Sequence, residues 1–172
     1  MTSKTVRLLS LIAAVGFWSA ALAPAWAEAD DPKALAAALK DATATLQGGL
    51  KASEREGTPI SAKFEIEDGK LQLSVYTAKG DTFSEVIVDQ KTGKVAKSEP
   101  INGGDDLAAA KSQNEAMSKA KTSLQAAVSK AVKVNKGYKA VSATPSLKDG
   151  HPTADITLMK GAESKTVSRP LD

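Results

Sequence analysis

The 172-residue chain contains no cysteine and only one histidine, His151. Without thiols it can form no disulfide, and it has neither a cysteine nucleophile nor a thiolate metal ligand. These absences exclude soft-metal sites and Cys–His catalytic pairs. A chain of this length can bury a hydrophobic core without disulfides to support it.

Long apolar runs are also scarce, and the one that is present, LLSLIAAVGFWSAALA, starts at Leu8. A short positive region with Lys4 and Arg7 precedes it, and Ala25-Trp26-Ala27 follows it. The run is shorter than the roughly 20 residues that span a bilayer, and small residues at 25 and 27 suit signal peptidase. We therefore expect a cleavable signal peptide at residues 1–27, a periplasmic location, and no membrane association after cleavage.

Neither aromatic residues nor net charge is abundant in the expected mature chain. Its aromatic residues are Phe64, Tyr76, Phe83 and Tyr138, and it has 21 Lys and Arg residues against 20 Asp and Glu residues. Nucleic-acid binding normally requires a clustered basic face, so we do not expect a nucleic-acid partner. The charges differ between the two halves, with a net charge of −3 for residues 28–100 and +4 for 101–172. Opposite net charges favour docking of one half against the other, or steer a partner of mixed charge.

Two Asp-Gly pairs, at Asp68-Gly69 and Asp149-Gly150, lie between runs in which every second residue is apolar. An apolar period of two is typical of a strand with one buried and one solvated face. Asp-Gly favours a type I′ turn, in which both central residues have positive φ. Each Asp-Gly pair therefore predicts a β-hairpin.

A shift of 81 positions superimposes the two hairpin segments. It places Ile60 on Val141, Val75 on Ile156 and Val86 on Val167, so the inward-facing positions coincide. We therefore predict an α+β fold made of two tandem repeats, at residues 28–100 and 101–172. Each repeat is expected to consist of one helix packed on an antiparallel β-meander. Pro145 and Pro152 predict short or edge strands in the second repeat.

Apolar residues at helical spacing precede both hairpins. The first helix is predicted to start with Asp31 as N-cap and Pro32, and Gly48-Gly49 leaves open whether it stops or kinks there. The linker between the repeats is predicted as KSEPINGGDD, from Lys97 to Asp106. The two apolar stripes are Leu35, Leu39, Ala42, Leu46 and Leu50, and then Leu107, Ala110, Met117, Leu124, Val128 and Ala131.

The first helix followed by FEIEDGKLQLSVYT and FSEVIVDQKTGKV resembles the PepSY domain, a cystatin-like domain of peptidase propeptides, YpeB-type proteins and other exported bacterial proteins. The most specific part is VDQKTGK at residues 88–94, where a strand ends at Asp89 and the chain turns through Thr92-Gly93. The second repeat lacks this ending, so its final strand is expected to be incomplete or absent. The resemblance implies a protein without enzymatic activity that binds or restrains a peptidase or another exported protein.

Catalytic motifs are absent from the sequence. His151 follows a predicted turn beside Pro152 and is expected to be an exposed turn residue. No serine stands in a G-x-S-x-G context that would activate it. We therefore expect neither an enzyme nor a bound cofactor.

A hard-cation or small-ligand binding protein is the alternative interpretation. Asp68, Asp81, Glu85 and Asp89 lie in or near loops of the first meander, and calcium-like ions are bound by several oxygen ligands. No D-x-D-x-D-G loop is present, and solvated loop carboxylates account for the same residues.

The strand face opposite the helix is the predicted partner-binding surface. A helix on one side of a sheet leaves the other side free, although an ordinary solvated face fits the pattern equally well. Tyr76 is the expected exposed anchor, so Tyr76→Ala should weaken binding without unfolding the chain. The oligomeric state remains open. The predicted residues are Lys63, Glu65, Gln72, Ser74, Tyr76, Thr144, Asp155 and Thr157.

Overall fold

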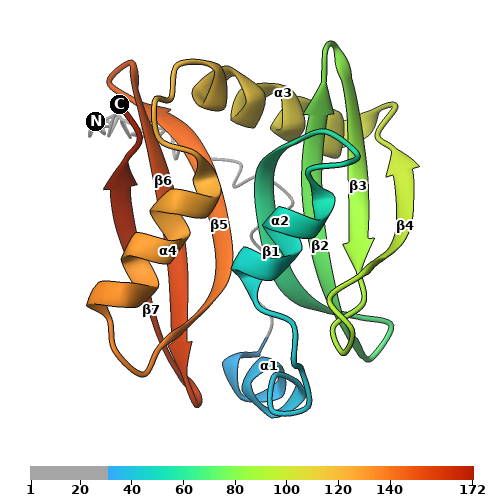
Figure 1. Ribbon diagram of the computed structural model, residues 1–172, viewed down its shortest axis with the longest axis vertical. Coiled ribbons are helices and arrows are strands. Elements are labelled where there is room, and N and C mark those ends of the chain that lie inside the picture. The colour runs from blue at the N-terminus through green and yellow to red at the C-terminus, as the bar shows by residue number, and fades with distance from the viewer. Residues whose placement is uncertain (1–30) are drawn as a thin grey trace, which may run out of the picture.

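A computed structural model describes residues 31–172 (Figure 1). The predicted signal peptide at residues 1–27 lies outside the described residues. None of the helices within 31–172 has the length and apolar character needed to cross a bilayer. The helices are α1 (Pro32–Ala38), α2 (Leu46–Ser53), α3 (Gly104–Ser118) and α4 (Leu124–Val134). The strands are β1 (Thr58–Glu67), β2 (Lys70–Lys79), β3 (Thr82–Val88), β4 (Val95–Pro100), β5 (Lys139–Lys148), β6 (His151–Lys160) and β7 (Glu163–Pro170).

The seven strands form one antiparallel sheet in the order β4-β3-β2-β1-β5-β6-β7. At its centre β1 pairs with β5 through Ala62↔Ala143 and Lys63↔Ser142. The predicted α+β class is thereby confirmed, and both halves of the chain contribute strands to one sheet. No strand follows β7 within residues 31–172, whereas β4 follows β3, as expected from the missing VDQKTGK segment.

The predicted hairpins are present with their predicted turns. Asp68 and Gly69 have φ values of 49° and 72°, and Asp149 and Gly150 have 52° and 81°. Strands β1, β2 and β3 begin at residues 58, 70 and 82, and β5, β6 and β7 begin at 139, 151 and 163, an offset of 81 in each case. A bulge lies between Pro59 and Ser61 in β1, and another between Ala140 and Ser142 in β5.

The two prolines of the second hairpin do not shorten its strands, so that prediction was wrong. β5 and β6 are each 10 residues long and both lie inside the sheet. Pro145 lies beyond the two residue pairs that join β5 to β1, so no backbone pairing with β1 requires its missing N–H. Pro152 is near the start of β6, where its carbonyl accepts a hydrogen bond from Leu171. A residue without an N–H is tolerated at such positions.

Each predicted single helix is divided into two, which corrects the expectation of one helix per repeat. α1 does start at Pro32 with Asp31 as its N-cap, but it ends at Ala38. The Thr45 hydroxyl then accepts a hydrogen bond from Gly48 N at 3.0 Å and caps α2, so Gly48 lies inside that helix. Likewise Ser123 caps α4 and separates it from α3. Threonine and serine favour the cap over the helix interior because their hydroxyls bond to nearby backbone.

The predicted linker is shorter than expected. Lys97–Pro100 belong to β4, and α3 begins at Gly104, so only residues 101–103 connect them.

The main core lies between the sheet and the helices α2 and α4, which lie in front of it in Figure 1. Leu46, Leu50, Leu124 and Val128 of these helices are almost fully buried. Each such side chain contributes about 1.5–3 kcal/mol on burial. The sheet residues of this core include Ala62, Phe64, Leu73, Val75, Val86, Val88, Ala143, Ile156 and Leu158.

A smaller core lies on the opposite side of the sheet, under α3. It joins Ala110 of α3 to Ile60, Tyr76, Ala78 and Phe83. Ile60 was expected on the α2 side, but the bulge between Pro59 and Ser61 places it here. Among residues 31–172, helices therefore cover the sheet along one face and only at one end of the other.

Candidate functional site

The strand register places all the predicted binding residues on the face opposite α2 and α4. Residues that pair directly across an antiparallel ladder share a face. Lys63 pairs with Ser74 on one side and with Ser142 on the other, and Ser142 pairs with Thr157. Thr144 pairs with Asp155, and Glu65 pairs with Gln72. We call this surface the polar face, defined by Lys63, Glu65, Gln72, Ser74, Thr144, Asp155 and Thr157.

One row of the polar face crosses the whole sheet and includes one residue from every strand. The row is unbroken at the β1–β5 junction, so both halves of the chain contribute to one surface. In spatial order its members are Lys97, Ile87, Ser74, Lys63, Ser142, Thr157 and Thr166.

The half of the polar face on β1–β3 is a hydrogen-bonded network around Glu65. Its carboxylate pairs with Lys63 Nζ at 2.5 Å and accepts the Ser74 hydroxyl at 2.7 Å. Gln72 Nε2 donates to Ser74 Oγ at 3.0 Å. Glu85 of β3 lies on the same face, opposite Tyr76. Burial raises the pKa of Glu85, the neighbouring Ser74 hydroxyl opposes this, and the charges of Glu65 and Asp106 raise it further.

The half of the polar face on β5–β7 is organised around Asp155. Lys148 Nζ donates to Asp155 Oδ1 at 2.8 Å and to Ser168 Oγ at 3.1 Å, and the Ser168 hydroxyl donates to Asp155. Burial alone would raise the pKa of Asp155, but the hydrogen bonds from Lys148 and Ser168 hold it below its ordinary value. The side chains of Lys148 and Asp155 are 48% and 38% exposed, so a partner can reach this ion pair.

Tyr76 is not the exposed anchor that was predicted. It points to the same side as the polar face but is only 6% exposed, because α3 covers it. Burial raises the pKa of its hydroxyl well above the ordinary value, and nearby Glu85 and Asp106 raise it further. Tyr76 therefore belongs to the small core, and substituting it would disturb the fold rather than a free surface.

Lys148, Ser142, Thr166 and Ser168 also lie on this side of the sheet but were not among the predicted residues. Their signal is the period of two along each strand, which puts Ser142 and Lys148 on the side of Thr144. The register of β7 against β6 cannot be read from the sequence alone, and it is this register that places Ser168 opposite Asp155.

The structure does not bring together the four carboxylates of the hard-cation alternative. Asp68 and Asp81 lie in turns at opposite ends of β2, and Glu85 lies within β3 rather than in a loop. Asp89 Oδ1 accepts hydrogen bonds from the backbone of Lys91 and Thr92 at 3.2 and 2.7 Å and so stabilises its own turn. Within residues 31–172, no three His, Cys, Asp or Glu side chains are placed to hold a metal ion.

His151 is exposed at the start of β6. Its Nδ1 lies 3.0 Å from Asp172 Oδ2. It has the exposed position beside a turn that was expected of it.

Comparison with known families locates a PepSY domain at residues 33–99, a family described as peptidase propeptide and YPEB domain. The matched segment spans nearly all of α1, together with α2, β1, β2, β3 and most of β4. No curated protein and no solved structure matches the chain.

Proposed function

We propose that the protein is a non-catalytic, exported binding protein that engages and restrains a peptidase or another periplasmic protein. The PepSY domain at residues 33–99 supports this proposal, since its family description names peptidase propeptides. A propeptide restrains its enzyme by binding to it, which requires an accessible surface and no catalytic group. The polar face offers such a surface at Thr144, which is exposed, and at Asp155, whose side chain is 38% exposed, on the side of the sheet away from α2 and α4.

We also infer that residues 28–100 and 101–172 are two copies of one PepSY-like unit. The strand starts, the Asp-Gly turns and the bulges all recur at an offset of 81. The helices recur at an offset of 78: Leu46, Gly49, Leu50 and Ser53 are buried in α2, and Leu124, Ala127, Val128 and Ala131 are buried in α4. The second copy has three extra residues between cap and strand, its first helix α3 has 15 residues where α1 has 7, and no strand follows β7 within residues 31–172.

Duplication explains why the polar face is broad. The central β1–β5 pairing sets the polar sides of the two units next to each other, so one partner contacts both. The first unit offers the carboxylates Glu65 and Glu85 with Lys63, and the second offers Lys148, Asp155 and hydroxyl groups. This mixture suits a partner surface with both charge signs, and charge placement of this kind selects partners more than it adds affinity.

The continuous row of polar residues across the β1–β5 junction carries the proposal. To test it, the purified protein is immobilised, periplasmic extract from the source bacterium is passed over it, and retained proteins are identified by mass spectrometry. We expect retention of a peptidase by the wild type and its loss with the double variant Thr144→Arg/Thr157→Arg. Ser129→Arg, on the exposed side of α4, is the matched control and should retain it. Equal retention by both variants would refute the polar face as the binding surface.

A further inference from the structure

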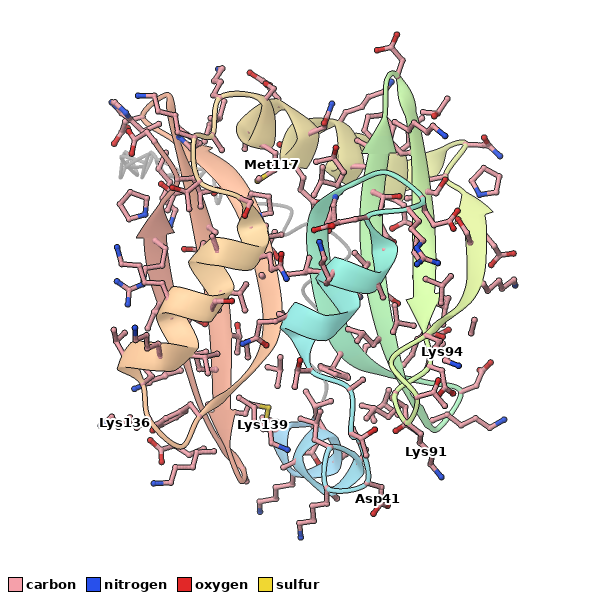
Figure 2. All side chains as sticks on the ribbon, viewed as in Figure 1. Asp41, Lys91, Lys94, Met117, Lys136 and Lys139 are labelled. Atoms are coloured by element: carbon pink, nitrogen blue, oxygen red, sulfur yellow. The ribbon has the colours of Figure 1, made fainter. Side chains whose placement is uncertain are left out.

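Two cavities lie at opposite ends of the helix pair α2 and α4. The first, which we call the Met117 cavity, has a volume of about 280 Å³ and lies where α2 ends and α4 begins. The second, which we call the Tyr138 cavity, has a volume of about 80 Å³ and lies where α4 ends and β5 begins. Figure 2 shows Met117 at the upper end of the molecule and Lys139, which lines the other cavity, at the lower end.

Seven of the eight residues that line the first cavity have a counterpart in the lining of the second, an observation that uses the duplication inferred above. Leu124 lines only the first cavity, and Ala42, Ala44 and Phe64 line only the second. The residues from the connectors and helices match at the offset of 78, and those from the strand starts match at 81. Glu54, Met117 and Gln125 of the first cavity correspond to Val132, Leu39 and Gln47 of the second. Gly57, Thr58 and Pro59 correspond to Tyr138, Lys139 and Ala140.

The main difference is that two aromatic rings, Phe64 and Tyr138, line the second cavity and none lines the first, and of these two only Tyr138 has a corresponding position in the lining of the first. Tyr138 is held in place on both sides, because Lys165 Nζ lies 4.1 Å from its ring centroid and its hydroxyl donates to Glu163 at 2.5 Å. Gly57 occupies the corresponding position and has no side chain. A Cβ there would lie 2.8 Å from the Ala78 carbonyl oxygen, so position 57 cannot supply a ring. The Met117 cavity is correspondingly the larger of the two.

We propose that the Met117 cavity binds an aromatic side chain of a partner polypeptide. Its volume of about 280 Å³ exceeds the roughly 150 Å³ of an engineered cavity that binds benzene, so it can hold a single ring. Leu124, which is 1% exposed, and Pro59 supply apolar surface, and the thioether of Met117 favours contact with a ring edge. The exposed Glu54 carboxylate, paired with Lys51 at 2.6 Å, accepts a phenol hydroxyl or a neighbouring cation of the partner.

This site lies on the helix side of the sheet, apart from the polar face, so it goes beyond the function proposed above. The test is an NMR titration of the isotope-labelled protein with p-cresol, which is the side chain of tyrosine as a free molecule. We expect saturable shifts of the amide signals of Thr58, Met117 and Gln125. The corresponding amides of Lys139, Leu39 and Gln47 should move little, because the Tyr138 cavity is smaller and already has its ring.

Matched substitutions give the proposal two further tests. Gln125→Trp fills the Met117 cavity and should weaken p-cresol binding at least tenfold, whereas Gln47→Trp in the corresponding position should leave it unchanged. Tyr138→Gly should create new saturable shifts at Lys139 and Gln47. Thr58→Trp replaces Gln125→Trp if the spectrum shows that the latter is unfolded. Absence of saturable shifts in the wild type, or equal binding by the filled variant, would overturn the proposal.

The polar-face variant Thr144→Arg/Thr157→Arg separates this proposal from the proposed function. It should bind p-cresol as the wild type does, even though it no longer retains the peptidase. Loss of p-cresol binding in that variant would show that the ring binds on the polar face instead and would overturn the site.

Discussion

The carbonyl oxygens of Gln90 and Leu171 accept equivalent pairs of backbone hydrogen bonds in the two halves of the sheet. The carbonyl oxygen of Gln90 accepts backbone hydrogen bonds from Thr43 and Ala44, both at 3.0 Å. The carbonyl oxygen of Leu171 accepts them from Lys121 and Thr122, at 2.7 and 2.8 Å. In both halves the segment just before the covering helix is thus hydrogen-bonded to a residue that follows the third strand of that half, which is β3 in the first half and β7 in the second. The N-caps Thr45 and Ser123 follow at once, so each covering helix starts from a fixed point.

These two caps should contribute equally to stability. Thr45→Ala and Ser123→Ala each remove the hydroxyl that accepts a helix N–H, at 3.0 and 3.2 Å. We expect each to lower the free energy of unfolding by about 1 kcal/mol, measured by urea denaturation. A cap whose removal costs nothing would show that the break in the apolar stripe has another cause.

The two adjacent glycines of α2 should respond to alanine with opposite signs. A Cβ on Gly49 would lie 2.6 Å from Leu73 Cδ2, and Leu73 is fully buried and cannot easily yield. We therefore expect Gly49→Ala to destabilise the protein by about 1–3 kcal/mol. Gly48 is exposed, and a Cβ there would lie 3.2 Å from the hydroxyl oxygen of Thr45, an exposed side chain that can move by the few tenths of an ångström required. Gly48→Ala should therefore stabilise the protein by up to about 1 kcal/mol through helix propensity. Thermal and urea denaturation of both variants would decide this, and a stabilised Gly49→Ala would contradict the close packing of α2 on β2.

Tyr76 should behave as a core residue. Tyr76→Ala leaves a cavity between β2 and α3, and we expect a loss of about 3–5 kcal/mol in the free energy of unfolding. Tyr76→Phe keeps the ring and removes only the hydroxyl that bonds with Asp106, which should cost about 1 kcal/mol. If Tyr76→Ala were as stable as the wild type, α3 could not cover this side of the sheet as described.

Glu85 should make the protein less stable as the pH rises. Burial, together with the charges of Glu65 and Asp106, raises its pKa above the ordinary value of 4.5. The folded state then holds this proton more tightly than the unfolded state, so stability falls as the pH rises from about 4.5 through the raised pKa. The Glu85→Gln variant should have a higher melting temperature than the wild type at neutral pH, and this difference in melting temperature should shrink towards pH 4. A difference in melting temperature between the two proteins that stays constant from pH 4 to 8 would contradict this environment for Glu85.

The hairpins could be predicted because their signals are local. Alternating apolar residues define which face each strand buries, and Asp-Gly supplies the positive φ of the turn. The helix breaks were missed because an apolar stripe continues through Leu39–Thr45 and hides the capping role of Thr45. The extent of β5 and β6 was missed because the tolerance of Pro145 depends on where β1 stops pairing.

The polar face could be assigned to one side of the sheet for the same local reason, because every second residue of a strand points to the same side. This alternation does not show which helix covers a face, so the burial of Tyr76 by Ala110 and the rest of α3 was not foreseen. The pairing of Lys63 with Ser142 joins residues far apart in the chain, and it alone makes the two polar surfaces continuous. The correspondence of Gly57 with Tyr138 became informative only when the two cavities were compared.

The most direct test of restraint through the polar face is inhibition of the peptidase that the immobilised protein retains. Its initial rate on a peptide substrate is measured against increasing concentrations of wild type, Thr144→Arg/Thr157→Arg and Ser129→Arg. We expect saturable inhibition by the wild type and by Ser129→Arg, and an inhibition constant at least tenfold higher for the polar-face variant. An unchanged rate at saturating wild type, or equal inhibition by all three proteins, would contradict this expectation.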